Sequence, residues 1–339
     1  MKVKIKEIRR LCEVILIKRG LKPAEAKIVV ADYLEGELLG KITHGLISFS
    51  GVIEKAGQTK AKKILVSRKS NNFLLLNANG QIGQLVAGVA TKAVIKMAKK
   101  IGIAMVGVYD SLPFLRPGSQ AEKIAENDLI GLVLINGGGP TVVPPGGLDA
   151  ILATNPIGFA IPTFGKPIVC DMAISKKAIS EVKLAKLLGR DLPEDSFVDK
   201  KGEIIKDPDS FFAALPFGDY KGFNLGILFE ILTGSLVNAE IGYKKKDIGS
   251  SKDKYGKKYR GALFIAINPS VFTSLKKFKQ KNSQFIKEIK SVKRKKGIKE
   301  IVIPGKKAYQ NKEIALRRGW LEVDKKIIEQ IKKLAGNTK

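Results

Sequence analysis

The chain has 339 residues, with 61 lysines and arginines against 32 acidic residues, so its formal net charge is +29. Hydrophobic residues make up 44 % of it, enough for a sizeable core, which excludes a disordered or collagen-like protein. No apolar stretch approaches the roughly 18 residues that would span a bilayer. Glu13 interrupts the first apolar stretch, so no secretory signal is predicted and we expect a cytoplasmic protein without a membrane segment.

The opening segment is predicted to be helical. Apolar residues recur at helical spacing from Ile5 to Arg19, and Gly20 follows as a stop signal. Pro23 suits the first turn of a second helix that ends before Gly40. A third, shorter helix is expected at 48–55.

From Asn71 onward, short apolar runs alternate with helical patterns, which is typical of an α/β sheet. The predicted strands are 73–76, 103–109, 130–135, 158–162, 168–170 and 262–267. The predicted helices are 84–100, 119–126, one beginning near Ser175, 222–236, one within 271–292, 307–318 and 324–334. We therefore predict a helical domain from 1–75 with 300–339, and an α/β domain from 76–299.

The positive charge invites a nucleic-acid interpretation. Lysine, however, is spread along nearly the whole chain, and the densest clusters, 244–246 and 293–296, have no interleaved aromatic residues for base stacking. A solvated basic surface is therefore favoured, and nucleic acid is not expected as a partner. The two cysteines, Cys12 and Cys170, have no Cys or His at metal-ligand spacing, so we predict small core residues and no metal site.

An unusual loop of glycine and proline runs from Asn136 to Gly147. Glycine allows backbone amides to come close to a ligand, whereas proline restricts the loop. The loop lacks the Gly-Lys-Ser/Thr ending of a P-loop and the Gly-x-Gly-x-x-Gly fingerprint of the usual dinucleotide fold. From these residues, a phosphate-binding loop and an ordered surface loop are both possible.

Three further residues have side chains that could take part in a functional site. His44 is the sole histidine and can move a proton near neutral pH, although a solitary histidine is more often structural. Asp171 ends an apolar strand, where it can accept hydrogen bonds from a ligand or cap the next helix. Lys221 precedes an apolar helix and could strengthen the positive end of that helix, or simply be a solvated charge.

In their order and spacing, several short motifs together resemble the malate/L-lactate dehydrogenase family, which also includes sulfolactate and ureidoglycolate dehydrogenases. The resemblance runs nearly end to end. The motifs are Thr43-His44-Gly45, Gly80-Gln81-Ile82-Gly83-Gln84, Pro144-Pro145-Gly146-Gly147, Thr154-Asn155-Pro156-Ile157, Asp171-Met172-Ala173, Leu215-Pro216-Phe217-Gly218 with Tyr220-Lys221-Gly222-Phe223, and Ile303-Pro304-Gly305.

This resemblance implies hydride transfer between NAD or NADP and a small 2-hydroxy or 2-keto acid, a mixed-sheet coenzyme domain that is not a Rossmann fold, and a homodimer. It places His44 beside the substrate. The residues it places at the coenzyme are Asn136, Gly137, Gly138, Asp171, Met172, Ala173 and Lys221.

Two positions depart from the family pattern. Pro113 stands where the family usually has its proton-accepting histidine, and proline has no ionisable group. Ser48 stands where the family tends to have an arginine for the substrate carboxylate. We therefore expect His44 to handle the proton, with Asp110 as a second candidate, and Arg116 with Ser48 as candidate substrate contacts.

Three hypotheses follow. The first is an NAD(P)-dependent oxidoreductase acting on a 2-hydroxy or 2-keto acid or a related carbonyl compound. The second is a catalytically degenerate member of the family that still binds a nucleotide, which the changes at Pro113 and Ser48 favour. The third, a basic nucleic-acid-binding protein, has the least support.

Overall fold

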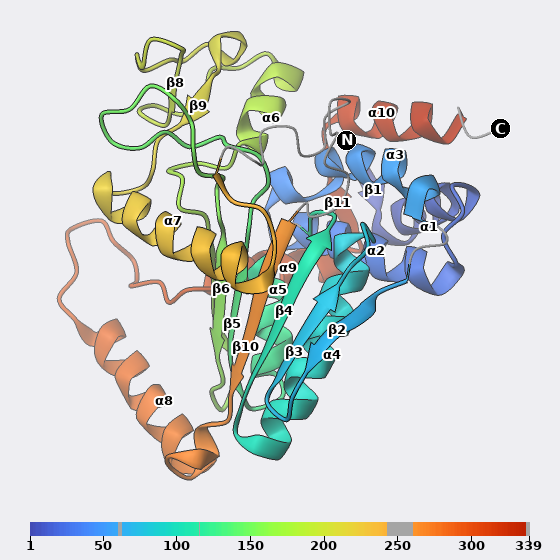
Figure 1. Ribbon diagram of the computed structural model, residues 1–339. Coiled ribbons are helices and arrows are strands. Elements are labelled where there is room, and N and C mark those ends of the chain that lie inside the picture. The colour runs from blue at the N-terminus through green and yellow to red at the C-terminus, as the bar shows by residue number, and fades with distance from the viewer. Residues whose placement is uncertain (60–62, 115, 243–259, 337–339) are drawn as a thin grey trace.

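The computed structural model describes residues 1–59, 63–114, 116–242 and 260–336. Helices from the two ends of the chain pack together in one core, and a seven-stranded sheet forms the rest of the molecule's framework (Figure 1). In the described part of the chain, no helix is both long and apolar enough to cross a membrane.

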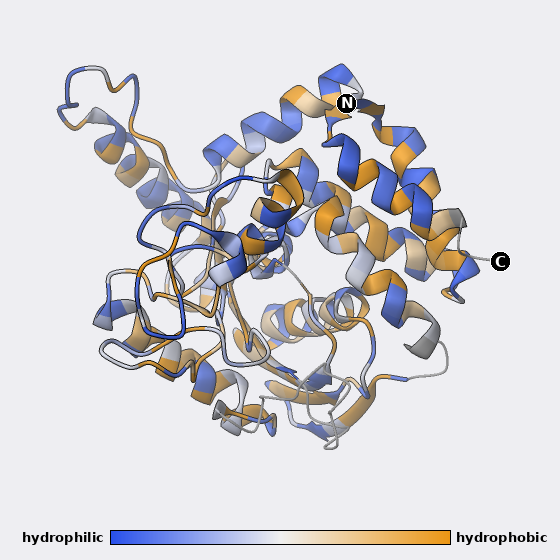
Figure 2. Ribbon diagram, turned by 90° about the horizontal axis from the view of Figure 1, so that it is seen from above, coloured by the Kyte–Doolittle hydropathy of each residue, from blue (hydrophilic) through white to orange (hydrophobic). Residues whose placement is uncertain are grey.

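The helical part combines three N-terminal helices with two C-terminal ones. Strand β1 (Lys2–Lys4) pairs antiparallel with β11 (Trp320–Glu322), which ties the two ends together. Leu16, Leu34 and Phe49 are fully buried in this core beside Ile327. In Figure 2 these helices carry hydrophilic and hydrophobic residues in alternation, as their periodicity predicts. The helices are α1 (Ile5–Lys18), α2 (Pro23–Leu38), α3 (Phe49–Thr59), α9 (Lys306–Arg318) and α10 (Lys325–Gly336).

The sheet is mixed, in the order β2-β3-β4-β10-β5-β6-β7, and only the β3–β4 pair is parallel. Its strands are β2 (Leu65–Lys69), β3 (Phe73–Asn77), β4 (Ile103–Ser111), β5 (Ile130–Ile135), β6 (Ile157–Ile161), β7 (Ile168–Met172) and β10 (Arg260–Ile267).

Helices cover both faces of the sheet. Because side chains alternate along a strand, Ala262 and Phe264 of β10 pack in the core with α4 (Gly83–Ile101) and α5 (Pro117–Ala125). Leu263 belongs instead to the core that α7 (Tyr220–Thr233) helps to form (Figure 1).

Outlying elements complete the fold. A short pair, β8 (Phe197–Val198) with β9 (Ala213–Ala214), lies near α6 (Ser180–Leu188), and α8 (Leu275–Ser291) projects from the end of the sheet (Figure 1). The prediction of an amphipathic helix within 271–292 is confirmed, but none of its residues is buried.

The predicted helices and strands of 73–76, 84–100, 103–109 and 130–135 are present within one or two residues of their bounds. The prediction of a helix from Ser175 was wrong, since α6 begins only at Ser180. Ser175 instead bridges to Pro216, and the Lys176 amide donates to the carbonyl of Leu215 at 2.8 Å, so this segment is held in an extended conformation.

The division into a domain of 1–75 with 300–339 and one of 76–299 stays a prediction. Residues 65–77 pair in the sheet as β2 and β3, rather than continuing the helical segment. The lysine cluster at 244–246 lies outside the described residues. The cluster at 293–296 is exposed.

Candidate active site

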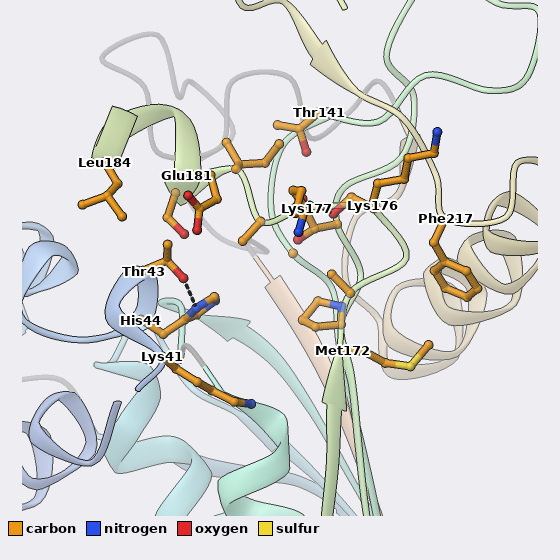
Figure 3. A pocket seen from close by; sticks show the side chains of 18 of the residues that line it. Lys41, Thr43, His44, Thr141, Met172, Lys176, Lys177, Glu181, Leu184 and Phe217 are labelled. Carbon is orange, nitrogen blue, oxygen red and sulfur yellow. Dashed lines mark hydrogen bonds between the residues drawn. The ribbon is translucent and has the colours of Figure 1, made fainter. Parts of the chain in front are cut away.

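A pocket of about 1220 Å³ lies between the N-terminal segment, the edge of the sheet and the start of α6. In Figure 3, Thr43 and His44 lie on one wall, Met172 and Phe217 lie across from them, and Glu181 comes from α6. A pocket of this size is large for a single small acid and is in the range of a drug-sized ligand or larger.

The turn that carries His44 is built by close backbone packing against α2. A Cβ on Gly45 would lie 2.2 Å from the Oε1 atom of Glu37, and a Cβ on Gly36 would lie 2.6 Å from the carbonyl oxygen of His44. The Leu46 amide donates to Glu37 Oε1 at 2.6 Å. The two glycines and the buried carboxyl therefore fix the position of the imidazole.

The electrostatics of this wall favour a neutral imidazole. Burial lowers the pKa of His44, and the charges of Lys41 and Arg116 lower it further, while Asp171 and Asp32 act in the opposite direction. The Nδ1 atom of the ring is 3.0 Å from the hydroxyl oxygen of Thr43. With Nδ1 facing Thr43, Nε2 is the ring nitrogen to consider for contact with a ligand in the pocket that His44 lines.

Asp171 lies near the end of β7, as the sequence predicts, and forms an ion pair with Lys41, Nζ to Oδ2, at 2.7 Å. Gly118, in the first turn of α5, packs against it, since a Cβ there would lie 2.5 Å from the Asp171 Cβ. The carboxylate is thus held beside the pocket by a partner 130 residues away in the sequence.

The glycine-rich loop is braced from behind by Asn155. Its Oδ1 atom accepts a hydrogen bond from the Gly137 amide at 3.2 Å, and its Nδ2 donates to Glu230 on α7 at 2.7 Å. Gly137 and Gly139 line the pocket, where the absence of side chains lets a ligand approach the backbone.

The pocket brings together a majority of the predicted site residues: His44, Arg116, Gly137, Asp171, Met172 and Ala173 line it. Asn136 and Gly138 lie in the same loop, and the buried Asn136 side chain donates to the Glu240 carbonyl at 3.2 Å.

Asp110, Ser48 and Lys221 lie elsewhere. Asp110 is buried, with a positive φ of 57°, and is not among the residues that line the pocket. The Ser48 hydroxyl donates to the Thr43 carbonyl at 2.9 Å, so it supports the His44 turn from outside the pocket. Lys221 is exposed in the first turn of α7.

Arg116 lines the pocket, but its guanidinium forms ion pairs with two carboxylates of α2. Its Nη2 atom donates to Asp32 Oδ1 at 2.9 Å and to Glu35 Oε2 at 3.2 Å, and the side chain is 2 % exposed. These two carboxylates raise the pKa of Arg116 against the opposing effect of burial.

Sequence reasoning missed several cationic residues of the pocket: Lys41, Lys176, Lys177, Arg190 and Arg260. Lys41 could have been suspected from its place three residues before the sole histidine. Nothing in the local pattern distinguishes the others from the many surface lysines and arginines.

Comparison with known proteins identifies the class. Residues 3–332 match the family described as malate/L-lactate dehydrogenase, and the chain belongs to that family. It is therefore an oxidoreductase, as its relatives are named dehydrogenases and reductases.

Individual relatives agree with this assignment over nearly their whole length. The chain is 34 % identical to a malate/(S)-sulfolactate dehydrogenase of Methanothermus fervidus, covering 97 % of this chain and 96 % of the relative. Among solved structures, a malate dehydrogenase of Entamoeba histolytica superposes with a TM-score of 0.92 at 25 % identity, covering 100 % and 98 % of the two chains. The sulfolactate dehydrogenase of Methanocaldococcus jannaschii gives 0.87 at 29 %, covering 100 % and 97 %.

Proposed function

We propose that this chain transfers a hydride between NAD or NADP and a small 2-hydroxy or 2-keto acid, with His44 as the group that holds the proton. The observation that carries the proposal is the buried imidazole of His44 on one wall of a large pocket, whose other walls include a glycine loop and cationic side chains.

The residues of the pocket fit a nicotinamide dinucleotide. Such a ligand carries phosphates, and the exposed Lys176 and Lys177 provide positive charge along the lining. Gly137 and Gly139 provide backbone that a planar or phosphate group can approach closely. When bound, the coenzyme would supply the hydride chemistry, and the protein would supply binding, orientation and proton transfer.

For oxidation of a hydroxy acid, His44 would accept the hydroxyl proton at Nε2, while Nδ1–H donates to Thr43. In the reverse direction the protonated ring would return that proton to the new hydroxyl oxygen. Because the pKa of His44 is lowered, the ring stays a competent base to a lower pH than an exposed histidine would.

The substrate class is supported by the family description, malate/L-lactate dehydrogenase, and by relatives that are named malate and sulfolactate dehydrogenases. All three substrates are 2-hydroxy acids, and each carries a carboxylate next to the reacting carbon. Several cations of the lining could meet the 2′-phosphate of NADP, so the test uses both coenzymes.

The test is to mix purified protein with NADH or NADPH and a panel of oxaloacetate, pyruvate and 3-sulfopyruvate, following absorbance at the nicotinamide band. We expect turnover that His44→Gln lowers by about 10²- to 10⁴-fold, the usual contribution of a positioned acid or base. Coenzyme binding without turnover would favour the degenerate nucleotide-binding member. Salt-sensitive DNA binding without coenzyme binding would overturn the proposal.

We further propose a homodimer and a coenzyme domain outside the Rossmann class. The dimer is supported by an apolar surface on α7, where Ile227, Leu228 and Ile231 are 42 %, 49 % and 48 % exposed. The second point is supported by the predominantly antiparallel sheet, since a Rossmann sheet is mostly parallel. A cytoplasmic location stays a prediction.

A further inference from the structure

One arginine of the pocket has no anionic partner among the described residues. Arg260 is the first residue of β10 and lines the pocket, opposite Ser111 of β4 in the strand register. Its Nε atom is buried and has no hydrogen-bond partner in the part of the chain that the structure describes. Within those same ranges, no carboxylate forms an ion pair with this partly buried side chain, although charged groups that lose solvent are normally paired.

The guanidinium group is held against the glycine-rich loop. A Cβ on Gly138 would lie 2.4 Å from Nη2 and 2.7 Å from Nε of Arg260, and Gly138 has a positive φ of 109°. Only glycine leaves room for this contact. This close approach places the guanidinium next to the loop residues Gly137 and Gly139, which line the pocket.

The other two arginines among the described lining residues are paired. Arg116 binds Asp32 and Glu35, and Arg190 binds Glu181 at 3.0 Å. Arg260 differs from both, because it has no such ion pair among the described residues.

Loss of solvent makes the charge of Arg260 unfavourable in the free protein. Burial lowers the pKa of Arg260 to about 10. Burial lowers the pKa of Lys55 first, and the charge of Arg260 lowers it further. A poorly solvated guanidinium with no described carboxylate paired to it is a site that an anion would stabilise.

We propose that Arg260 binds the carboxylate of the substrate and is the residue that selects an acid over its neutral analogues. This inference rests on the proposed function. A guanidinium fork matches the two oxygens of a carboxylate, whereas the exposed Lys176 and Lys177 of the same pocket suit the phosphates of the coenzyme. Arg260 thereby provides the positive charge for the substrate carboxylate that the family pattern places at position 48, where this chain has serine.

The binding test uses oxalate as a carboxylate probe, titrated by calorimetry into the full-length protein with NADH or NADPH present and absent. We expect Arg260→Met to weaken oxalate binding about 100-fold and Arg260→Lys to weaken it about tenfold, with coenzyme affinity changed less than twofold. Arg317→Met, which removes the same charge from an exposed pair with Glu313, is the control and should leave both affinities unchanged.

The kinetic test compares pyruvate with methyl pyruvate, which has no negative charge. We expect Arg260→Met to raise KM for pyruvate with a smaller change in kcat, and to leave methyl pyruvate reduction nearly unchanged. A merely structural role would lower both activities together and lower the unfolding temperature. Because no described carboxylate loses a partner, we expect that temperature not to fall.

Unchanged oxalate binding in Arg260→Met would overturn the proposal. Weakened coenzyme binding with normal oxalate binding in Arg260→Met would also overturn it, because the guanidinium would then bind a phosphate of the coenzyme. If Arg260→Met does not fold, Arg260→Lys carries the same test, because it keeps the charge and loses the fork. Failure of the proposed function is separate: a protein without turnover that still binds oxalate through Arg260 loses the reaction but keeps this site.

Discussion

The buried carboxyl of Glu37 should make the free energy of unfolding depend on pH, and Glu37→Gln should remove this dependence. Burial raises the pKa of Glu37 from 4.5 to about 7, against the opposing effect of the hydrogen bond from the Leu46 amide. Between these two values the folded chain keeps a proton that the unfolded chain has lost. The resulting stability is therefore full below pH 4.5 and is lost as the pH rises through 7.

The size of this effect follows from the pKa change. Each pKa unit corresponds to about 1.4 kcal/mol, so the free energy of unfolding should fall by about 3 kcal/mol between pH 4.5 and pH 8 through this one group. In Glu37→Gln the amide oxygen can still accept from Leu46, but the side chain no longer ionises. The variant should therefore gain about 3 kcal/mol relative to the native chain over that pH range.

The assay is urea unfolding followed by circular dichroism at pH 4.5, 6, 7 and 8, with the two chains compared at each pH so that other titrating groups cancel. Glu313→Gln on α9 controls for loss of an exposed carboxylate and should change stability by less than about 1 kcal/mol at every pH. A difference between Glu37→Gln and the native chain that does not change with pH would refute the reasoning.

Three further predictions concern packing, the imidazole and assembly. Gly158→Ala should lower the free energy of unfolding by about 2 kcal/mol or more, because the new Cβ would lie 2.2 Å from a backbone nitrogen of α5. The control Gly165→Ala meets nothing within 4 Å and should be nearly neutral. Equal losses of the two variants in urea unfolding would contradict this. Lys41→Met should raise the pKa of His44, followed by NMR on the sole imidazole, and a lowered value would contradict the assignment. Leu228→Glu should convert a dimer to monomers in sedimentation, and a persisting dimer would exclude this face.

A large part of the pocket could be predicted from the amino-acid sequence alone. His44, the glycine loop and Asp171 stand out by their residue types and by their places at the ends of predicted elements, and all three line one pocket. The roles proposed for Asp110, Ser48 and Lys221 remain predictions, although none of these residues lines it. Their chain positions carry no information on where their side chains point.

Local patterns determined the majority of the helices and strands, because the periodicity of apolar residues is a property of neighbouring residues. The start of α6 was an exception, since bridging to Pro216 keeps Ser175 extended. The three-dimensional fold alone decided which charges meet. Lys41 reaches Asp171, and Arg116 turns toward Asp32 across 84 positions of sequence. Arg260 lies against Gly138 because β10 runs between β4 and β5 in the sheet. Such contacts depend on the order of strands and the packing of helices on them, which no short stretch of sequence encodes.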